Sequence, residues 1–286
     1  MKNQKAIVTL AIGEKYHTPW KKYCEPNWRR YADRYGFDLI CLESPLDTSE
    51  RARTRSVAWQ KCLILSQNFA SGYDQMVWID SDIMFNSGAP DITASVPLEK
   101  VGAAYEMTFS PVYLNRAFKL WPTAIINYTP REYYSAYGLQ PDCDKVLNTG
   151  VMVLSPEFHR TILERVYYSY EEKGGREWHM EMRPLSYELV KAGVVHWIDP
   201  RFNLMWPSEE IIRYPFLVKP PAQQGLRARI ERKIKSVVNS SSSRRLRAAC
   251  LNATFQSNFF LHFGGNDTDQ MEMVNQHATS WWDVLT

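Results

Sequence analysis

The sequence lacks the features that define several broad classes of protein. No apolar run approaches the roughly 20 residues that span a membrane as a helix. The apolar stretch at residues 6–12 is interrupted by Thr9 and ended by Gly13, so it is too short and too polar for a typical signal peptide. The five cysteines show no CxxC spacing, which predicts neither a thiolate zinc site nor a paired disulfide framework. We therefore expect a cytoplasmic protein in a reducing compartment.

The composition is that of an ordinary globular protein. Hydrophobic residues make up 45% of the chain and charged residues 23%, which argues against disorder, collagen and coiled coil. At roughly 150 residues per domain, a chain of 286 residues forms one large domain or two small ones. Such a chain is long enough to bury a sizeable core.

Charge is distributed unevenly along the chain. Nine residues between positions 219 and 247 are basic and one is acidic, so this segment carries +8 and the rest of the chain −5. Residues 225–238 place apolar side chains on one face of a basic helix. This pattern is typical of peripheral membrane contact through residues 225–247, and the alternative is a helix packed on the body with a solvated basic face. Nucleic-acid binding is not expected, because the body is net acidic and no recognised module is present.

Apolar strands alternate with amphipathic helices. The predicted strands are residues 6–12, 37–42, 76–79, 101–105, 148–155, 194–198 and 259–261. The predicted helices are residues 18–35, 56–69, 156–170, 185–192 and 225–238. Residues 116–137 contain two prolines and predict irregular structure, and residues 239–243 predict a flexible linker. The alternation indicates an α/β fold with a mostly parallel central sheet and helices on both faces.

Two carboxylates follow the most apolar of these strands. Residues 76–79 form a continuous apolar run, as in a central strand buried on both faces, and they lead directly into Asp80-Ser81-Asp82. If strand geometry continues, the two aspartates point to the same side. Ligands of open α/β sheets bind at the carboxyl ends of the strands. Two like charges held together there favour a divalent cation such as Mn²⁺ or Mg²⁺, although Asp-x-Asp also occurs in exposed loops and helix caps.

Four motifs in one order give the chain a family resemblance. They are the strand at residues 6–12, Val-Trp-Ile-Asp-Ser-Asp at 77–82, Leu-Asn-Thr-Gly-Val-Met-Val-Leu at 147–154, and Leu-His-Phe-Gly-Gly at 261–265. The chain resembles a GT-A nucleotide-sugar glycosyltransferase over roughly residues 5–265. It is most similar to the retaining groups. One contains glycogenin and the bacterial lipooligosaccharide galactosyltransferases, and the other contains the Golgi-type α-galactosyl-, α-mannosyl- and α-xylosyltransferases.

The resemblance implies a metal site and a catalytic pair. Asp80 and Asp82 would hold Mn²⁺, with Mg²⁺ as the alternative, against the diphosphate of the donor, and His262 would be the third protein ligand. The alternative for His262 is a hydrogen-bonded core histidine beside apolar residues. Asn148 would hydrogen-bond the transferred sugar, unless it only bonds at a strand edge. Glu181 would be the carboxylate near the anomeric carbon, or an ordinary surface glutamate.

The resemblance also implies a set of donor-binding residues. Thr9 and Ala11 would line the base pocket, Tyr16 would stack on the base or simply pack, and Ser81 would lie near the ribose. The complete donor-binding set is Thr9, Ala11, Tyr16, Lys61, Ser81, Asn148, Thr149, Gly264 and Gly265. Trp121, Trp178 and Trp206 are candidates for an acceptor platform, because aromatic faces pack against sugars.

One departure from the family concerns a basic residue. Family members often have a lysine after the histidine motif that pairs with the diphosphate, and the corresponding place, about Thr268, is not basic here. Lys61, Arg53 and Arg55 are the candidates to replace it.

The sequence thus predicts a metal-dependent hexosyl- or pentosyltransferase. Its donor would be a UDP-sugar, its acceptor a glycan or glycolipid hydroxyl, and it would retain the anomeric configuration. The alternatives are a sugar nucleotidyltransferase and a non-catalytic sugar-binding module. We expect a single catalytic domain at residues 1–265, including a basic helical insertion at about 219–249, and a C-terminal helical tail at residues 266–286.

Overall fold

The structure is a computed structural model. It describes residues 4–120, 129–140, 142–173, 180–218, 240–264 and 268–276. The predicted basic helix at 225–238, the two candidate platform tryptophans Trp121 and Trp178, and Gly265 lie outside these ranges.

The core of the fold is a six-stranded sheet in the order β2-β1-β3-β6-β5-β7. Its strands are β1 (Lys5–Leu10), β2 (Phe37–Leu42), β3 (Gln75–Ile79), β5 (Val101–Tyr105), β6 (Leu147–Leu154) and β7 (Val195–Trp197). The sheet is mostly parallel, and only β6 runs against its neighbours β3 and β5. Every residue of β3 and of β6 is buried. For β3 this confirms the prediction of a central strand covered on both faces.

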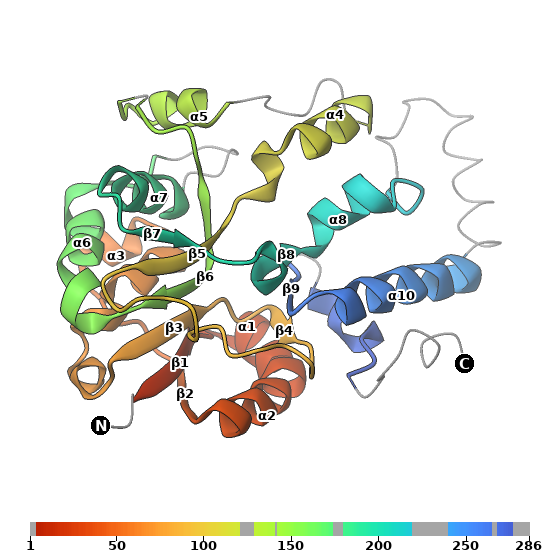
Figure 1. The fold of residues 1–286 in the computed structure, drawn as a ribbon, viewed down its shortest axis with the longest axis horizontal. Coiled ribbons are helices and arrows are strands. Elements are labelled where there is room, and N and C mark those ends of the chain that lie inside the picture. Colours follow the sequence, from red (N-terminus) through yellow and green to blue (C-terminus); the bar gives the residue numbers. More distant parts are fainter. Residues whose placement is uncertain are drawn as a thin grey trace.

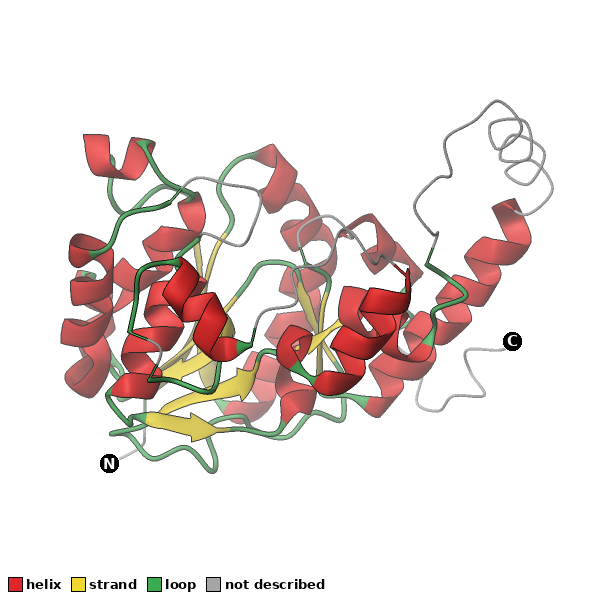
Figure 2. Ribbon diagram, turned by 90° about the horizontal axis from the view of Figure 1, so that it is seen from above, coloured by secondary structure: helices red, strands yellow, loops and turns green. Residues whose placement is uncertain are grey.

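Helices cover both faces of this sheet (Figures 1 and 2). The α-helices of the described residues are α1 (Glu14–Pro19), α2 (Glu25–Tyr35), α3 (Glu50–Arg53), α4 (Pro111–Leu120), α5 (Pro130–Ala136), α6 (Pro156–Ser169), α7 (Met182–Lys191), α8 (Trp206–Arg213) and α10 (Ser240–Ser257), of which α4, α5, α8 and α10 lie away from the sheet faces. A π-helix, Trp20–Cys24, joins α1 to α2, and 3₁₀ helices occupy Val57–Ser66, Asn68–Gly72, Met107–Phe109, Pro200–Asn203 and Thr268–Met273.

Alternate residues of the central strands face two different layers. Val77 and Ile79 of β3 pack in one core with Trp28 and Tyr31 of α2. Trp78, which points the other way, packs in a second core with residues of α6 and α7. The predicted α/β architecture with helices on both faces is therefore confirmed.

A second sheet of three short strands lies beside the first, in the order β4-β9-β8. Its strands are β4 (Ile83–Phe85), β8 (Leu204–Met205) and β9 (Phe260–His262). Helix α2 supports β4, because Asn27 Nδ2 donates to Phe85 O at 2.7 Å and Trp28 Nε1 donates to Ile83 O at 2.7 Å. These bonds fix the residues that directly follow the Asp-Ser-Asp sequence.

Several local predictions were wrong. The first helical region begins at Glu14, before Thr18, although it ends at Gly36 as predicted, with that glycine at φ 70°. The part of 116–137 that the structure describes includes the end of α4 and all of α5, where Thr129 and Glu132 form a capping box. Residues 240–243, predicted as linker, begin α10.

The C-terminal part of the described chain packs on the body. Arg247 of α10 pairs with Glu210 of α8 and donates to Leu217 O at 2.8 Å. Met271 and Val274 join the same core as α2 and β3. The boundary at residue 265 remains a prediction.

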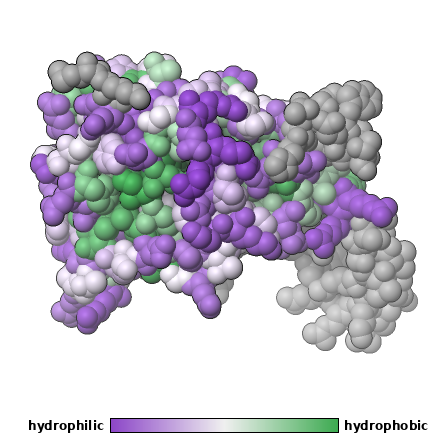
Figure 3. Space-filling view, turned by 90° about the horizontal axis from the view of Figure 1, so that it is seen from below, coloured by the Kyte–Doolittle hydropathy of each residue, from purple (hydrophilic) through white to green (hydrophobic). Residues whose placement is uncertain are grey.

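The sheet edge is partly open. β2 is an edge strand, and four of its six residues are only half-buried. Seen from below, the side on which β2 lies, apolar residues gather into a patch surrounded by polar ones (Figure 3).

No helix among the described residues is both long enough and apolar enough to cross a membrane.

Candidate metal centre

Asp80 and Asp82 lie in the turn between two sheets. β3 ends at Ile79 and β4 begins at Ile83, so the aspartates occupy a turn and not a continuing strand. The backbone N–H of Asp80 donates to Gly150 O at 2.8 Å, which ties the turn to the neighbouring strand β6. Their side chains are 28% and 15% exposed, so the carboxylates are partly open to solvent on a fixed backbone.

Strand register brings His262 to these carboxylates. His262 of β9 pairs with Ile83 of β4, the residue directly after Asp82, and the N–H of Phe263 donates to Asp82 O at 3.0 Å. His262 Nε2 lies 3.3 Å from Asp82 Oδ1 and 4.0 Å from Asp80 Oδ2. One ligand atom from each of the three residues lies within 4.8 Å of the other two. The structure thus brings the three predicted ligands together.

The two oxygens of Asp80 have different surroundings. Oδ1 accepts from Lys61 Nζ at 3.1 Å and from Trp78 Nε1 at 2.8 Å. Oδ2 is the oxygen that lies toward His262. Since Oδ1 is already engaged by two donors, Asp80 offers a cation one oxygen and not two.

Lys61 is a buried cation between two carboxylates. Its Nζ lies 3.1 Å from Asp80 Oδ1 and 2.9 Å from Glu181 Oε1, and it donates to Thr149 O at 3.3 Å. Burial by itself lowers the pKa of Lys61, and the charges of Asp80 and Glu181 outweigh it, so the pKa lies above its ordinary value. Lys61 therefore remains charged and couples Glu181 to the aspartate turn.

Glu181 is the N-cap residue of α7 and is 2% exposed. Its Oε1 accepts from Thr149 Oγ1 at 3.0 Å as well as from Lys61. Its Oε2 is buried and has no hydrogen-bond partner within the described residues. The alternative of a surface glutamate is wrong, because the side chain is buried beside the aspartate turn.

The cluster carries the charges that a divalent cation requires. Burial lowers the pKa of His262, and Asp82 and Asp80 raise it more, so that the net pKa lies above its ordinary value. An imidazole nitrogen and two carboxylate oxygens are a suitable donor set for Mn²⁺. Neighbouring ligand atoms around such an ion are about 3 Å apart. The 3.3 Å between His262 Nε2 and Asp82 Oδ1 is close to this value, and the 4.0 Å to Asp80 Oδ2 is longer. The residues present therefore fit the predicted cation.

The predicted donor-binding residues occupy the same end of the main sheet. Thr9 and Ala11 are buried at the end of β1, where Val8 pairs with Trp78 of β3. Thr9 Oγ1 has no hydrogen-bond partner among the described residues. Tyr16 on α1 is 44% exposed, which leaves its ring accessible to a planar ligand.

Two further predicted donor residues are described. Ser81 is half-buried between the two aspartates. Gly264 has φ 65°, and a Cβ there would lie 3.2 Å from Met205 Cε and 3.4 Å from Pro207 Cγ, so the position favours glycine. That these groups contact a donor remains a prediction.

Two sequence-level candidates do not fit their roles. Trp206 is fully buried and its Nε1 donates to Gln270 at 2.9 Å, so it is a core residue and not an acceptor platform. Arg55 is also buried, and it donates to Tyr167 O and Tyr170 O at the end of α6. These bonds hold Arg55 at the end of α6, so it does not replace the missing lysine. Lys61, which contacts Asp80, and the exposed Arg53 remain as candidates.

Sequence reasoning missed two residues that adjoin the site. Asn203 ends the 3₁₀ helix Pro200–Asn203, and its Oδ1 lies 2.9 Å from His262 Nδ1. Glu106 accepts from Asn148 Nδ2 at 2.6 Å. No local motif marks either residue. For Glu106 the available signal was its position directly after the predicted strand at residues 101–105, and Asn203 had no such signal.

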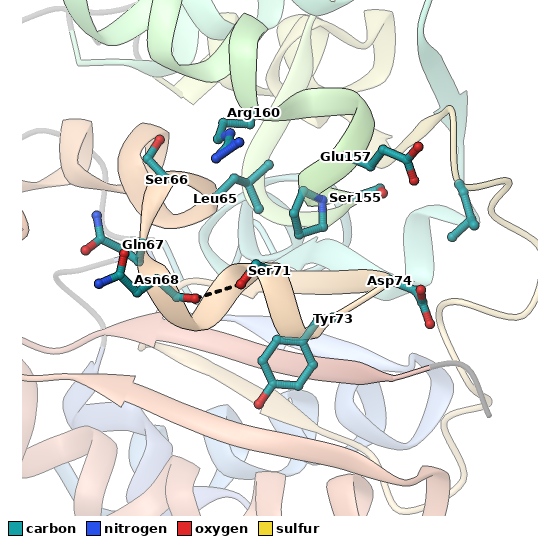
Figure 4. A pocket seen from close by; sticks show the side chains of 12 residues that line it. Leu65, Ser66, Gln67, Asn68, Ser71, Tyr73, Asp74, Ser155, Glu157 and Arg160 are labelled. Carbon is teal, nitrogen blue, oxygen red and sulfur yellow. Dashed lines mark hydrogen bonds between the residues drawn. The ribbon is translucent and has the colours of Figure 1, made fainter. Parts of the chain in front are cut away.

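A pocket of about 570 Å³ lies at the other end of the central strands, away from the aspartate turn (Figure 4). Asp74, directly before β3, and Ser155, directly after β6, help to line it. Since the aspartate turn follows the other end of β3, this pocket is not part of the metal cluster.

Comparison with solved structures gives the fold. The chain resembles "a glycosyltransferase involved in the glycosylation of the major capsid of PBCV-1", with 16% identity, a TM-score of 0.51 and coverage of 94% of this chain and 100% of that one. It also resembles the WbbM bifunctional glycosyltransferase, with 12% identity and a TM-score of 0.54. All of this chain is covered in that match, but only 52% of the WbbM chain, about half its length. No family model and no curated protein sequence matches. The chain therefore has a fold found in solved glycosyltransferases.

Proposed function

We propose that this chain is a metal-dependent glycosyltransferase of the GT-A type. It would transfer a hexose or pentose from a UDP-sugar to a hydroxyl of a glycan or glycolipid, with retention of the anomeric configuration. One observation carries the proposal. Asp80, Asp82 and His262 converge at the carboxyl end of a central strand, in a fold found in solved glycosyltransferases.

The cluster suits Mn²⁺, with Mg²⁺ as the alternative. Asp80 Oδ2, Asp82 Oδ1 and His262 Nε2 would be its protein ligands. When bound, such a cation neutralises the negative charge that develops on a departing diphosphate. Lys61 supports this arrangement, because it holds the other oxygen of Asp80 and adds a fixed positive charge beside the site.

The chain's own residues would orient the donor. Thr9, Ala11 and Tyr16 surround the end of β1 and would take the base, and Ser81 would approach the ribose. Asn148 Oδ1 already accepts two hydrogen bonds, from Gly150 N and Asn203 Nδ2, and one N–H of Nδ2 is donated to Glu106, so a contact with the sugar would come from the second N–H of that nitrogen. This placement is consistent with a nucleotide above the aspartate turn.

Glu181 is the candidate for the carboxylate near the anomeric carbon. In a front-face route the leaving phosphate takes the proton of the acceptor hydroxyl, so no general base is needed. In a double displacement a carboxylate must attack the sugar. Glu181 Oε2 is the oxygen not already bonded to Lys61 or Thr149, and it would be the attacking atom.

The described part of residues 225–247 gives limited support to membrane association. Within the described portion of that segment, Arg244 pairs with Glu272 and Arg247 pairs with Glu210, so both cations are engaged inside the chain. Arg245 is exposed. The cytoplasmic location likewise remains a prediction.

A nucleotidyltransferase is not favoured. Such an enzyme would need a glycine-rich loop after the first strand, and the turn after β1 contains Gly13 as its single glycine.

The test is hydrolysis of a panel of UDP- and GDP-sugars in Mn²⁺ and in EDTA. We expect turnover of a UDP-sugar with Mn²⁺ and none with EDTA. Asp82→Ala should reduce the rate by at least about a hundredfold, since it removes charge stabilisation of the leaving group. Asp33→Ala, at an exposed position on α2, is the matched control and should keep the wild-type rate. Full activity of Asp82→Ala would refute the metal role.

A further inference from the structure

A line of buried hydrogen bonds extends behind His262, away from the aspartates. His262 Nδ1 lies 2.9 Å from Asn203 Oδ1, Asn203 Nδ2 donates to Asn148 Oδ1 at 2.8 Å, and Asn148 Nδ2 donates to Glu106 Oε2 at 2.6 Å. All four residues are more than nine-tenths buried. Three separate segments of the chain are thus joined behind one imidazole ring.

A backbone amide fixes the direction of this line. The N–H of Gly150 can only donate, and it lies 2.8 Å from Asn148 Oδ1, so that atom is the amide oxygen. The amide nitrogen of Asn148 then faces the Glu106 carboxylate, which can only accept when ionised. Glu106 is held in turn by the backbone N–H and hydroxyl of Thr108, at 3.0 and 2.8 Å.

The same reasoning extends to the histidine. Because Asn148 presents an oxygen, Asn203 must turn its NH₂ group toward Asn148 and its own oxygen toward His262. A neutral imidazole facing an oxygen at Nδ1 carries its proton there. The other nitrogen, Nε2, is then the unprotonated one, and it is the nitrogen that faces Asp80 and Asp82.

We propose that Asn203, oriented by Asn148 and Glu106, is a positioning residue that fixes the tautomer of His262 and presents the Nε2 lone pair to a divalent cation held between Asp80 and Asp82. The proposal rests on the metal site of the proposed function. Partners of this kind orient a ligating histidine through its second nitrogen.

Without Asn203 the ring would have a competing arrangement. Asp82 Oδ1 lies 3.3 Å from Nε2, so the opposite tautomer could donate Nε2–H to it. That arrangement would block the nitrogen that the cation needs. A metal ion would then have to displace this hydrogen bond before binding.

The test measures Mn²⁺ affinity by titration calorimetry in the full chain. Asn203→Leu keeps the volume, excludes water and removes the acceptor, and should weaken Mn²⁺ binding about tenfold to a hundredfold. Asn203→Asp keeps an acceptor for Nδ1–H and should lose less than about tenfold. Asn252→Leu removes a similarly buried amide that bonds only within the C-terminal region, and should bind Mn²⁺ like wild type.

A second readout needs no metal. The readout is a long-range ¹H–¹⁵N NMR spectrum of metal-free wild-type protein, recorded above the pH at which the His262 resonance finishes titrating. It should show a protonated Nδ1 and an unprotonated Nε2 in His262. Bare Nδ1 with protonated Nε2 would overturn the proposal, as would wild-type Mn²⁺ affinity in folded Asn203→Leu. If wild type bound no Mn²⁺, the metal site itself would fail, and the spectrum would still decide the tautomer. The spectrum likewise decides if Asn203→Leu does not fold.

Discussion

Gly150→Ala should disturb the metal site through packing alone. A Cβ at this position would lie 2.5 Å from His262 Cε1, 2.9 Å from His262 Nδ1 and 3.0 Å from Asn148 Oδ1. Ordinary contacts begin at 3.4 Å, so the imidazole must move by roughly 1 Å in a close-packed interior. His262 Nε2 lies 3.3 Å from Asp82 Oδ1, so we expect a shift of this size to displace the imidazole from its ligand position.

We expect two measurable consequences of Gly150→Ala. Overpacking should reduce the free energy of unfolding by about 1–3 kcal/mol, measured with urea. Loss of the histidine ligand should weaken Mn²⁺ binding by about tenfold to a hundredfold, measured by titration calorimetry on folded protein.

Two matched glycines separate these effects. Gly102→Ala also meets close neighbours, including Val96 Cγ2 at 2.8 Å, but it lies away from the cluster. It should lose stability and keep its Mn²⁺ affinity. Gly72→Ala meets no atom within 4 Å and should change neither quantity. If Gly150→Ala bound Mn²⁺ as wild type does, the packing of Gly150 against His262 would not control the metal site.

Three further predictions concern charge in the site. Lys61→Met should leave Asp80 and Glu181 without their cation and lower the free energy of unfolding, measured with urea, by about 3 kcal/mol. Lys15→Met, at an exposed position, should lower it by almost nothing. Equal stabilities of the two variants would contradict the buried ion pairs. The pKa of His262 is raised in the folded, metal-free protein, so protonation of this residue stabilises the fold. This stabilisation is complete below the ordinary histidine pKa of about 6.5, and it is lost as the pH rises through the raised pKa of the folded state. Mn²⁺ affinity should change oppositely, weakening as the pH falls through the same pKa, because protons compete for Nε2, and a pH-independent affinity would contradict this. Glu181→Gln should keep Mn²⁺ affinity but lower turnover. Loss of all transfer would favour a covalent route, and a partial loss the front-face route.

The sequence predicted the elements whose signal is local. The apolar run of β3 is long enough to show burial on both faces, and the polar residues after it mark the end of the strand. Gly36 and Gly193 ended helices as expected, with φ 70° and 67°. These features depend on a few neighbouring residues, so a single sequence can reveal them.

The remaining features depend on tertiary contacts. β4 and β8 contain three and two residues, too few to show any periodicity, yet their pairing with β9 places His262. Asn203 and Glu106 carry no motif, and their roles follow only from where β8 and β5 lie relative to the histidine. Trp206 was misassigned because an aromatic side chain in the core and one on a binding surface look alike in sequence.

The central claim is that Asp80, Asp82 and His262 hold one cation against a nucleotide diphosphate. Pulsed electron paramagnetic resonance of Mn²⁺ bound to the protein, with and without UDP, tests it most directly. We predict ¹⁴N coupling from a single imidazole, lost in His262→Gln and kept in His196→Gln, and ³¹P coupling that appears when UDP is added. Bound Mn²⁺ without the imidazole coupling, or without phosphorus coupling in the presence of UDP, would contradict the account.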